Sequence, residues 1–366
     1  MQLRINKIFK TQKKIGYSIE SDKELKGIEV DCCEGVNSIV FSQKAKKAFE
    51  RLSFNILREY PHSLIIKDSI IKYWKNYTSL ENDRIFLGYG SMFCLRSINR
   101  LFLQSGDRVL GYVPQFVGYE SDVKMWDCKY EYVSLKEDNN YKFDEDEFIS
   151  HIDSSYKLIY IDNPNNPTGQ VIPLSAIEKI LKVAEKLNVG VILDEAYGEY
   201  MDSSNSAMML VNRYENLICV KSFSKGYGLA GLRIGYMIVP NQLVFAMKNI
   251  IYPVEMPTIG RYVAAEALAD SQFIAEIKAK TCEIKSILMK EWNTLKLAET
   301  SPNVSIMMIS HQDKSINLAR LFEQRRIKVV SGKYFTGLDL NSVRINIPGE
   351  RKLKLLIQAF EEIDSC

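Results

Sequence analysis

The sequence predicts an α/β protein whose larger part is built on a mainly parallel sheet with helices on both faces. Seven short apolar runs, separated by longer helical or mixed segments, carry this prediction. The runs are residues 85–87, 109–113, 130–133, 158–161, 189–193, 217–220 and 234–239. Continuous apolar runs of this length are typical of strands buried on both faces, and intervening helices supply the crossovers that parallel strands need.

The chain before this alternation has a different texture. Residues 1–38 show no clear period, and we expect an arm with short extended pieces. Ser42 is placed to cap a helix, because its hydroxyl can accept from backbone N–H groups of the first turn. The apolar face of that helix would carry Ala45, Ala48, Phe49 and Leu52. A further helix is expected from Asp68 onward.

Helical periodicity also fills one interval between strands and much of the chain after Pro257. Pro173 stands at a first-turn position, and one apolar face recurs from there to residue 188. Beyond Pro257 we expect a long helical stretch to about residue 292. Strands at 304–309, 329–330 and 343–347, a helix at 315–326 and a closing helix should follow. We therefore predict an arm (1–38), a large domain (39–257) and a smaller α+β domain (258–366).

Composition narrows the class of protein. The chain has 366 residues, 46% of them hydrophobic and 25% charged, which is ordinary for a globular protein. A net charge of +3 gives no reason to expect nucleic acid or a membrane surface as a partner. Seven cysteines without a C-x-x-C, and three widely spaced histidines, argue against a disulfide scaffold and a metal site. With a polar start and no long apolar stretch, we expect a cytoplasmic protein.

Ligands of open parallel sheets bind beyond the carboxyl ends of the strands, so the residues after each run matter most. After the first run, Gly90, Ser91 and Met92 open a helical segment. Backbone N–H groups and the helix dipole would favour an anion there. The alternative is a plain turn in which Ser91 is the N-cap.

Two other strand ends carry polar side chains. After the run at 158–161 comes D-N-P-N-N-P-T-G, where the amide of Asn166 is placed to donate to a ligand oxygen. After the run at 189–193 comes D-E-A-Y. Asp194 is costly to bury there unless it is paired, and a cationic ring nitrogen would pair it. The alternative is a helix N-cap.

Residues 221–239, K-S-F-S-K-G-Y-G-L-A-G-L-R-I-G-Y-M-I-V, contain a lysine between two buried strands. An amine that loses its proton on burial can attack a carbonyl, which favours Lys225 as a nucleophile. The stretch also matches G-x-G-x-x-G. A strand-like run follows it, and no acidic residue stands about 20 residues later, so a dinucleotide site is disfavoured.

In chain order these features are an anion loop, an Asn-rich turn, an Asp, a Tyr, Ser-x-Ser-Lys and an Arg, the parts that hold pyridoxal 5′-phosphate (PLP). On the motifs N-P-N-N-P-T-G, D-E-A-Y and S-x-S-K-(x)7-R, the chain resembles the class I and II aminotransferases of PLP fold type I. Within them it is similar to the histidinol-phosphate aminotransferase and threonine-phosphate decarboxylase branch. The resemblance implies a three-layer αβα large domain and an aminotransferase that acts on an L-amino acid and a 2-oxo acid.

The resemblance also implies roles for single residues at the cofactor. Lys225 would form the Schiff base and shuttle the α-proton, and Asp194 would keep the pyridine nitrogen protonated. Asn166 and Tyr197 would hydrogen-bond the ring oxygen, and Phe116 would stack on the ring. The phosphate would be held by Gly90, Ser91, Met92, Ser222, Ser224 and Arg233.

Three further roles concern the substrate and a second subunit. Arg344 would clamp the substrate carboxylate, and Asn37 would line the substrate side. Tyr60 would reach the phosphate of the neighbouring subunit, which implies a homodimer whose N-terminal arm packs with the small domain and the partner.

Alternatives stay open at this point. Phe116 is also explained by core packing, and Arg344 by a surface strand. Ser331 stands where histidinol-phosphate enzymes tend to carry an arginine, which argues against a phosphorylated substrate unless Lys333 or Arg351 substitutes. The same motifs would serve a PLP-dependent decarboxylase, lyase or cyclase. A non-catalytic protein that keeps the fold is disfavoured by the presence of Lys225.

Overall fold

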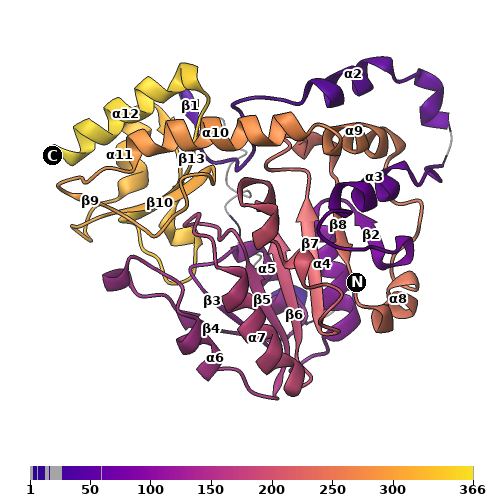
Figure 1. Cartoon of the computed structure of the whole chain (residues 1–366). Coiled ribbons are helices and arrows are strands. Elements are labelled where there is room, and N and C mark those ends of the chain that lie inside the picture. The colour runs from indigo at the N-terminus through magenta and orange to yellow at the C-terminus, as the bar shows by residue number, and fades with distance from the viewer. Residues whose placement is uncertain (1–2, 6, 13–15, 17–26, 59, 366) are drawn as a thin grey trace.

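The computed structural model describes residues 3–5, 7–12, 16, 27–58 and 60–365. A seven-stranded sheet forms the centre of the larger part, and a smaller sheet with its own helices lies beside it (Figure 1). The large sheet has the strand order β2-β8-β7-β6-β5-β3-β4. All seven runs predicted as strands are strands of this sheet. Their bounds are Ile85–Gly88, Arg108–Val113, Lys129–Ser134, Tyr156–Asp162, Gly190–Glu195, Leu217–Ser222 and Gly235–Ile238, for β2 to β8 in turn.

The large sheet is mainly parallel, as the sequence predicts. β3, β4, β5, β6 and β7 run parallel to one another. β8 alone runs antiparallel, to β2 on one side and to β7 on the other. The connections that follow β3, β5, β6 and β7 therefore meet at one edge of the sheet, where ligands of such sheets bind.

Helices cover both faces, because successive side chains of a strand point to opposite sides. On one face α3 (Ile65–Trp74), α7 (Leu174–Lys186) and α9 (Thr258–Leu268) pack against side chains such as Ile159 and Val191. On the other face α4 (Ser91–Phe102), α5 (Val117–Met125) and α8 (Asn241–Lys248) pack against the intervening side chains, such as Tyr160 and Ile192. This is the expected three-layer αβα architecture.

The smaller part has an antiparallel sheet of order β12-β13-β10-β9. Its strands are Val330–Ser331, Ser342–Asn346, Ile306–His311 and Leu295–Leu297 in that order. α10 (Ser271–Leu288), α11 (Leu318–Gln324) and α12 (Glu350–Asp364) pack on it around a separate core. β1 (Val30–Asp31) of the predicted arm pairs in parallel with β11 (Ile327–Lys328), so part of the arm lies on the smaller part.

Several expected boundaries differ from those observed. α2 (Gln43–Arg51) is capped by Ser42 as predicted, but α3 begins three residues before Asp68. The predicted long helix after Pro257 is two helices, α9 and α10, separated at Asp270. The Asp270 carboxylate accepts from the Ser42 hydroxyl at 2.6 Å, so the break between the two helices is linked to the start of α2. The short strand β9 was not expected, whereas β1 is one of the short extended pieces expected in the arm.

α9 lies beyond the predicted domain boundary at residue 257, yet it packs against α2 and α3. The domain limits stay a prediction.

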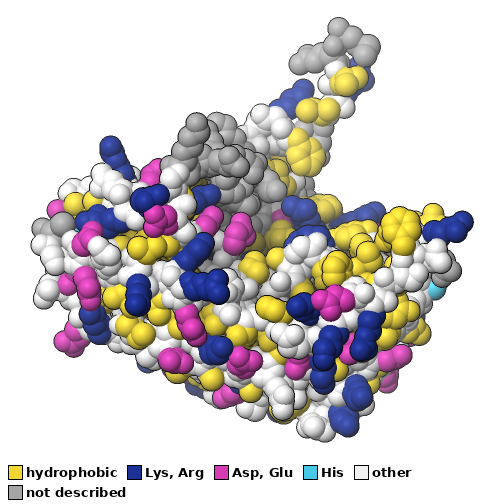
Figure 2. All heavy atoms as spheres, turned by 90° about the horizontal axis from the view of Figure 1, so that it is seen from above, with side chains coloured by type: hydrophobic (Ala, Val, Ile, Leu, Met, Phe, Trp, Pro, Cys, Tyr) yellow, Lys and Arg dark blue, Asp and Glu magenta, His cyan; other side chains and the backbone are white. Residues whose placement is uncertain are grey.

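One surface of the large part is unusually apolar. The segment that contains α2 and continues to the start of α3 exposes large side chains, and Figure 2 shows apolar side chains gathered over this region. The exposed fractions include 82% for Phe54 and 77% for Tyr60. Exposed apolar patches of this kind mark interaction surfaces. Among the described helices, none is both long and apolar enough to cross a bilayer.

Candidate active site

A pocket lies where the carboxyl ends of β5, β6 and β7 meet. It has a cavity volume of about 180 Å³. Ten of the residues predicted for the site line it: Ser91, Met92, Phe116, Asn166, Asp194, Tyr197, Ser222, Ser224, Lys225 and Arg233. Strands that are neighbours in the sheet bring these residues together although they span more than 140 positions of sequence.

Lys225 follows β7 in the connection that leads to β8. Its carbonyl accepts from the backbone N–H groups of Asn37 and Gly228, both at 3.0 Å, which fixes the chain at this point. The amine lies 5.6 Å from the centre of the Tyr197 ring. The side chain is half-buried, so it reaches the pocket without being enclosed as the sequence suggested.

Asp194 lies near the end of β6 and is 3% exposed. Its Oδ2 accepts from the Tyr160 hydroxyl at 2.9 Å, and its Oδ1 accepts from the Ala196 N–H at 3.1 Å. Burial, followed by the negative charge of Asp162, raises the pKa of Asp194 to about 7. A cation placed next to this carboxylate would restore its ionised form. The alternative role as a helix N-cap is wrong, because the helical turn that follows β6 is Gly198–Tyr200 and its N-cap is Tyr197.

The phosphate-type donors come from two connections at the adjacent strands β2, β8 and β7. Gly90 is the N-cap of α4 and Ser91 is its first residue, so the alternative of Ser91 as N-cap is wrong. Arg233 donates to the carbonyls of Ala230 at 3.0 Å and Tyr89 at 3.3 Å. Its φ of 54° lies in the left-handed region, which costs a non-glycine residue about 1–2 kcal/mol.

Glycines let these two connections approach each other. A Cβ at Gly90, which has a φ of 82°, would lie 2.8 Å from Arg233 Nη2. A Cβ at Gly235 would lie 2.7 Å from the Ser91 nitrogen. A larger residue at either position would separate the α4 N-terminus from the arginine. Gly90 and Gly235 therefore serve the close packing of these two connections.

Tyr197 is covered by the chain that precedes the large domain. A Cβ at Gly35 would lie 1.8 Å from the Tyr197 hydroxyl oxygen, so only glycine fits there. Glu34 and Val36, on either side of Gly35, line the pocket. Asn37 does not line it. Its amide donates to the carbonyls of Val40 at 2.8 Å and Gly226 at 3.1 Å, so its predicted substrate contact stays a prediction.

Arg344 lies on β13 of the smaller sheet and is 1% exposed, so the alternative of a surface arginine is wrong. Its Nη1 donates to Asn166 Oδ1 at 3.2 Å, and its Nη2 donates to the Cys33 carbonyl. The contact to Asn166 places this guanidinium at the junction of the two sheets. Tyr60 lies apart from the pocket, on the exposed apolar surface.

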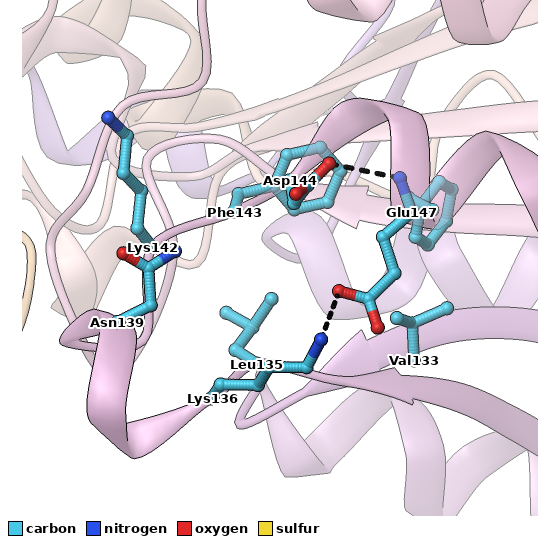
Figure 3. A pocket seen from close by; sticks show the side chains of 9 residues that line it. Val133, Leu135, Lys136, Asn139, Lys142, Phe143, Asp144 and Glu147 are labelled. Atoms are coloured by element: carbon cyan, nitrogen blue, oxygen red, sulfur yellow. Dashed lines mark hydrogen bonds and ion pairs between the residues drawn. The ribbon is translucent and has the colours of Figure 1, made fainter.

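A second, smaller pocket has no such chemistry. Figure 3 shows that three of its polar residues, Lys136, Asp144 and Glu147, already bind one another. Lys136 pairs with Glu147 at 3.0 Å, and Asp144 caps α6 (Glu145–Ser150) by accepting from the Asp146 and Glu147 N–H groups. Within the described ranges, no group of three or more His, Cys, Asp or Glu side chains is arranged to hold a metal ion.

Comparison with known proteins identifies the family. Residues 30–360 match the family model described as aminotransferase class I and II. The chain belongs to this family. The aminotransferase is 26% identical to the histidinol-phosphate aminotransferase of Methanococcus aeolicus over 311 residues, which cover 84% of this chain and 82% of that protein. It is 30% identical over 270 residues to histidinol-phosphate aminotransferase 2 of Carboxydothermus hydrogenoformans, with 73% of each chain covered.

A solved structure supports the fold. The histidinol-phosphate aminotransferase of Sinorhizobium meliloti, in complex with pyridoxal-5′-phosphate, superposes with a TM-score of 0.83 and 20% identity, covering 100% of this chain and 98% of that one. The chain is therefore a PLP-dependent aminotransferase of fold type I, and it is similar to the histidinol-phosphate branch. The sequence prediction of fold, enzyme class and cofactor is confirmed.

Some residues of the pocket were not predicted from sequence. Glu34, Val36, Asp162, Pro164, Ala196 and Ala230 also line it. Asp162 had a visible signal, since it opens the Asn-rich turn at a strand end. Glu34 and Val36 had none, because they precede the first predicted helix and reach the pocket only through the tertiary fold.

Proposed function

We propose that this aminotransferase exchanges an amino group between an L-amino acid and a 2-oxo acid in this pocket, with Lys225 as the residue that binds the cofactor covalently. One observation carries the proposal. A single pocket combines Lys225, the buried Asp194 and phosphate-type donors, all from connections at one edge of the sheet. PLP, when bound, supplies an electron sink for the bonds at the substrate α-carbon.

The residues present fit that cofactor. Ser222 and Ser224, the α4 N-terminus and Arg233 form a donor set with positive partial and full charge, which suits a phosphate dianion. These groups stand at the β2, β8 and β7 side of the sheet, whereas Asp194 ends the next strand, β6. This order allows the phosphate and the ring nitrogen to be bound at separate, adjacent strand ends.

The surroundings of each side chain at the pyridine ring support the role that we propose for it. Asp194, held by Tyr160 and the Ala196 N–H, keeps a proton on the ring nitrogen. Asn166 and Tyr197 donate to the ring oxygen, and Phe116 packs against the ring from the β3–α5 connection. These roles for single residues extend the family assignment.

Lys225 and Arg344 act on the substrate. The amine of Lys225 accepts the α-proton and returns it, because it is the only lysine among the described residues lining the pocket. Arg344 binds the substrate carboxylate through two parallel N–H donors, a geometry in which arginine is favoured. Its contact to Asn166 would align the carboxylate with the ring.

We further propose a homodimer that buries the exposed apolar segment around Phe54, Leu57 and Tyr60, with Tyr60 reaching the phosphate of the neighbouring site. Apolar side chains exposed to this extent suit a permanent interface. A cytoplasmic location also belongs to this proposal.

The decisive experiment measures covalent cofactor binding and a single turnover. Purified protein should be yellow, and borohydride should attach the cofactor to a peptide that contains Lys225. Lys225→Ala should bind PLP without covalent attachment and lose turnover. Mixed with an amino acid, the enzyme should convert PLP to pyridoxamine phosphate.

Two results would overturn the proposal. A colourless protein that takes up no PLP would remove the cofactor assignment. Release of carbon dioxide with the aldehyde form of the cofactor retained would show a decarboxylase instead of an aminotransferase.

A further inference from the structure

Three carboxylates, Asp194, Asp162 and Glu34, line the pocket, and the roles above use only Asp194. Asp162 is the last residue of β5 and is paired in register with Asp194 of β6. It is 3% exposed. A carboxylate buried to this extent is costly unless donors surround it, so its partners reveal what it holds in place.

Four donors converge on the Asp162 carboxylate. Its Oδ1 accepts from the Tyr112 hydroxyl at 2.8 Å, the Gln115 amide at 3.0 Å and the Asn165 amide at 3.1 Å. Its Oδ2 accepts from the Asn166 backbone N–H at 2.9 Å. All four donors are uncharged, so the carboxylate acts as a multiple hydrogen-bond acceptor and not as half of an ion pair.

These donors belong to two separate turns. Tyr112 lies near the end of β3, and Gln115 follows that strand immediately before Phe116, whereas Asn165 and Asn166 follow β5. A second bond reinforces the connection, since the Asn165 amide also donates to the Pro114 carbonyl at 3.2 Å. The carboxylate therefore links the turn that presents Phe116 to the turn that presents Asn166.

We propose that Asp162 is a positioning residue of the cofactor site, whose carboxylate sets the placement of Phe116 and Asn166 relative to each other and so the shape of the slot for the pyridine ring. The inference rests on the proposed function, in which both side chains contact that ring. Asp162 acts through these neighbours and needs no contact with the reacting atoms.

Asp162→Asn tests the proposal because it keeps the size of the side chain and changes the number of acceptors. The carboxylate accepts on both oxygens, whereas an amide offers one acceptor and one donor group. At least one buried N–H or O–H is then left facing another donor. We expect PLP to bind the apo-enzyme about 10- to 100-fold more weakly, measured by titration of protein fluorescence.

Asp364→Asn is the matched control. Asp364 accepts from the backbone N–H groups of Asn293, Thr294 and Leu295 in the smaller part of the molecule, so its substitution also deprives several backbone donors of a carboxylate. We expect this variant to lower the melting temperature while its PLP affinity stays within about twofold of wild type. A loss of PLP affinity that accompanies destabilisation in both variants would overturn the proposal.

A double-mutant cycle with Asn166→Ala separates positioning from general damage. If Asp162 acts through Asn166, the affinity of the double variant for PLP should equal that of the single variant with the lower affinity. The absorption band of bound PLP should also move in Asp162→Asn and not in Asp364→Asn, because hydrogen bonds to the ring set its electronic properties. Losses of affinity that simply multiply, or an unchanged band, would contradict the proposal.

Tyr112→Phe keeps the test open if Asp162→Asn does not fold. It removes one donor and keeps the ring that packs against Phe143 and Phe148. We expect a smaller loss of PLP affinity, about 3- to 10-fold, with the same shift of the absorption band. Wild-type affinity in Tyr112→Phe would count against Asp162. Wild-type protein that binds no PLP would instead refute the proposed function and leave the hydrogen-bond network unexplained.

Discussion

At the scale of single residues, Arg344 is the side chain that joins the two sheets at the site. Arg344 lies on β13 of the smaller sheet and donates to Asn166, which follows β5 of the large sheet. The guanidinium is therefore placed to bind a ligand that lies between the two sheets. The guanidinium is almost fully buried, which strengthens a charge-assisted hydrogen bond to a carboxylate relative to the same bond in water.

Arg344→Ala should therefore weaken substrate binding far more than cofactor binding. We expect the KM for the amino acid to rise at least about 100-fold, because a bidentate charged contact is lost, while the Kd for PLP changes by less than about threefold. Arg344→Lys should recover only part of the loss, since lysine lacks the planar pair of donors. Steady-state kinetics and PLP titration of both variants check this, and an unchanged KM would remove the assigned role.

A second residue-scale feature is a buried carboxyl beside an ion pair. Lys221 pairs with Glu195 at 2.8 Å, and both side chains are almost completely buried. Glu199 lies close to them, its Oε2 has no hydrogen-bond partner, and burial raises its pKa to about 7. Its side chain also packs against Gly226, next to Lys225.

This raised pKa makes stability depend on pH. Between the unfolded value near 4.5 and the folded value near 7, the folded state binds more protons than the unfolded state. Stability should therefore fall as pH rises through this window, and Asp194 of the cofactor-free protein adds to the same slope. We expect Glu199→Gln to reduce the loss of melting temperature between pH 5 and 8. Thermal melts of wild type and variant across that range measure it, and parallel curves would refute it.

At the scale of elements, the site depends on how closely separate segments approach. The chain around Gly35 crosses over Tyr197, and the Asn37 N–H donates to the Lys225 carbonyl. The segment thus restrains the lysine connection through a backbone hydrogen bond. It also packs against the tyrosine at a position where only glycine fits.

Gly35→Ala should displace Tyr197 or the crossing segment. We expect kcat to fall about 10-fold or more and stability to drop by about 1–3 kcal/mol, because the added methyl group overlaps the tyrosine hydroxyl. Gly231→Ala is the control, since a Cβ there would meet nothing within 4 Å. Kinetics and thermal melts of the pair check the prediction, which fails if the two variants behave alike.

At the scale of the whole molecule, the exposed apolar segment that includes Phe54, Leu57 and Tyr60 is the feature that a lone chain leaves unexplained. A monomer would expose these side chains to water at a cost of about 25 cal/mol per Å². Sedimentation should give the mass of a dimer, and Leu57→Lys should shift it toward the monomer.

Shared active sites can be tested by mixing two inactive variants. Lys225→Ala and Tyr60→Ala, expressed together, form mixed dimers in which one site has both residues intact. If Tyr60 serves the neighbouring site, we expect about one quarter of wild-type activity from a random mixture of subunits. Activity that never exceeds that of the separate variants would place Tyr60 outside the partner's site.

The sequence predicted the large part of the fold because its strands are specified locally. Each of the seven apolar runs is long enough to form a short strand that is buried on both faces. Each run is followed by a polar or glycine-rich segment that is suited to a turn. Helix ends were less predictable. The sequence predicts one helix through Asp270, whereas the structure has a break there, and the Asp270 carboxylate accepts from the Ser42 hydroxyl, 228 positions away.

The strands, the enzyme family and pocket residues such as Lys225, Asp194 and Asn166 could be predicted from the sequence alone, since motifs at strand ends carry their chemistry within a few residues. Three features became visible only in the folded chain: Arg344 lies against Asn166, Glu34 and Val36 line the pocket, and Asp162 links two turns. These contacts depend on strand order and on the packing of one sheet beside the other. Local hydrophobic patterns do not encode them, because the partners are far apart in the chain.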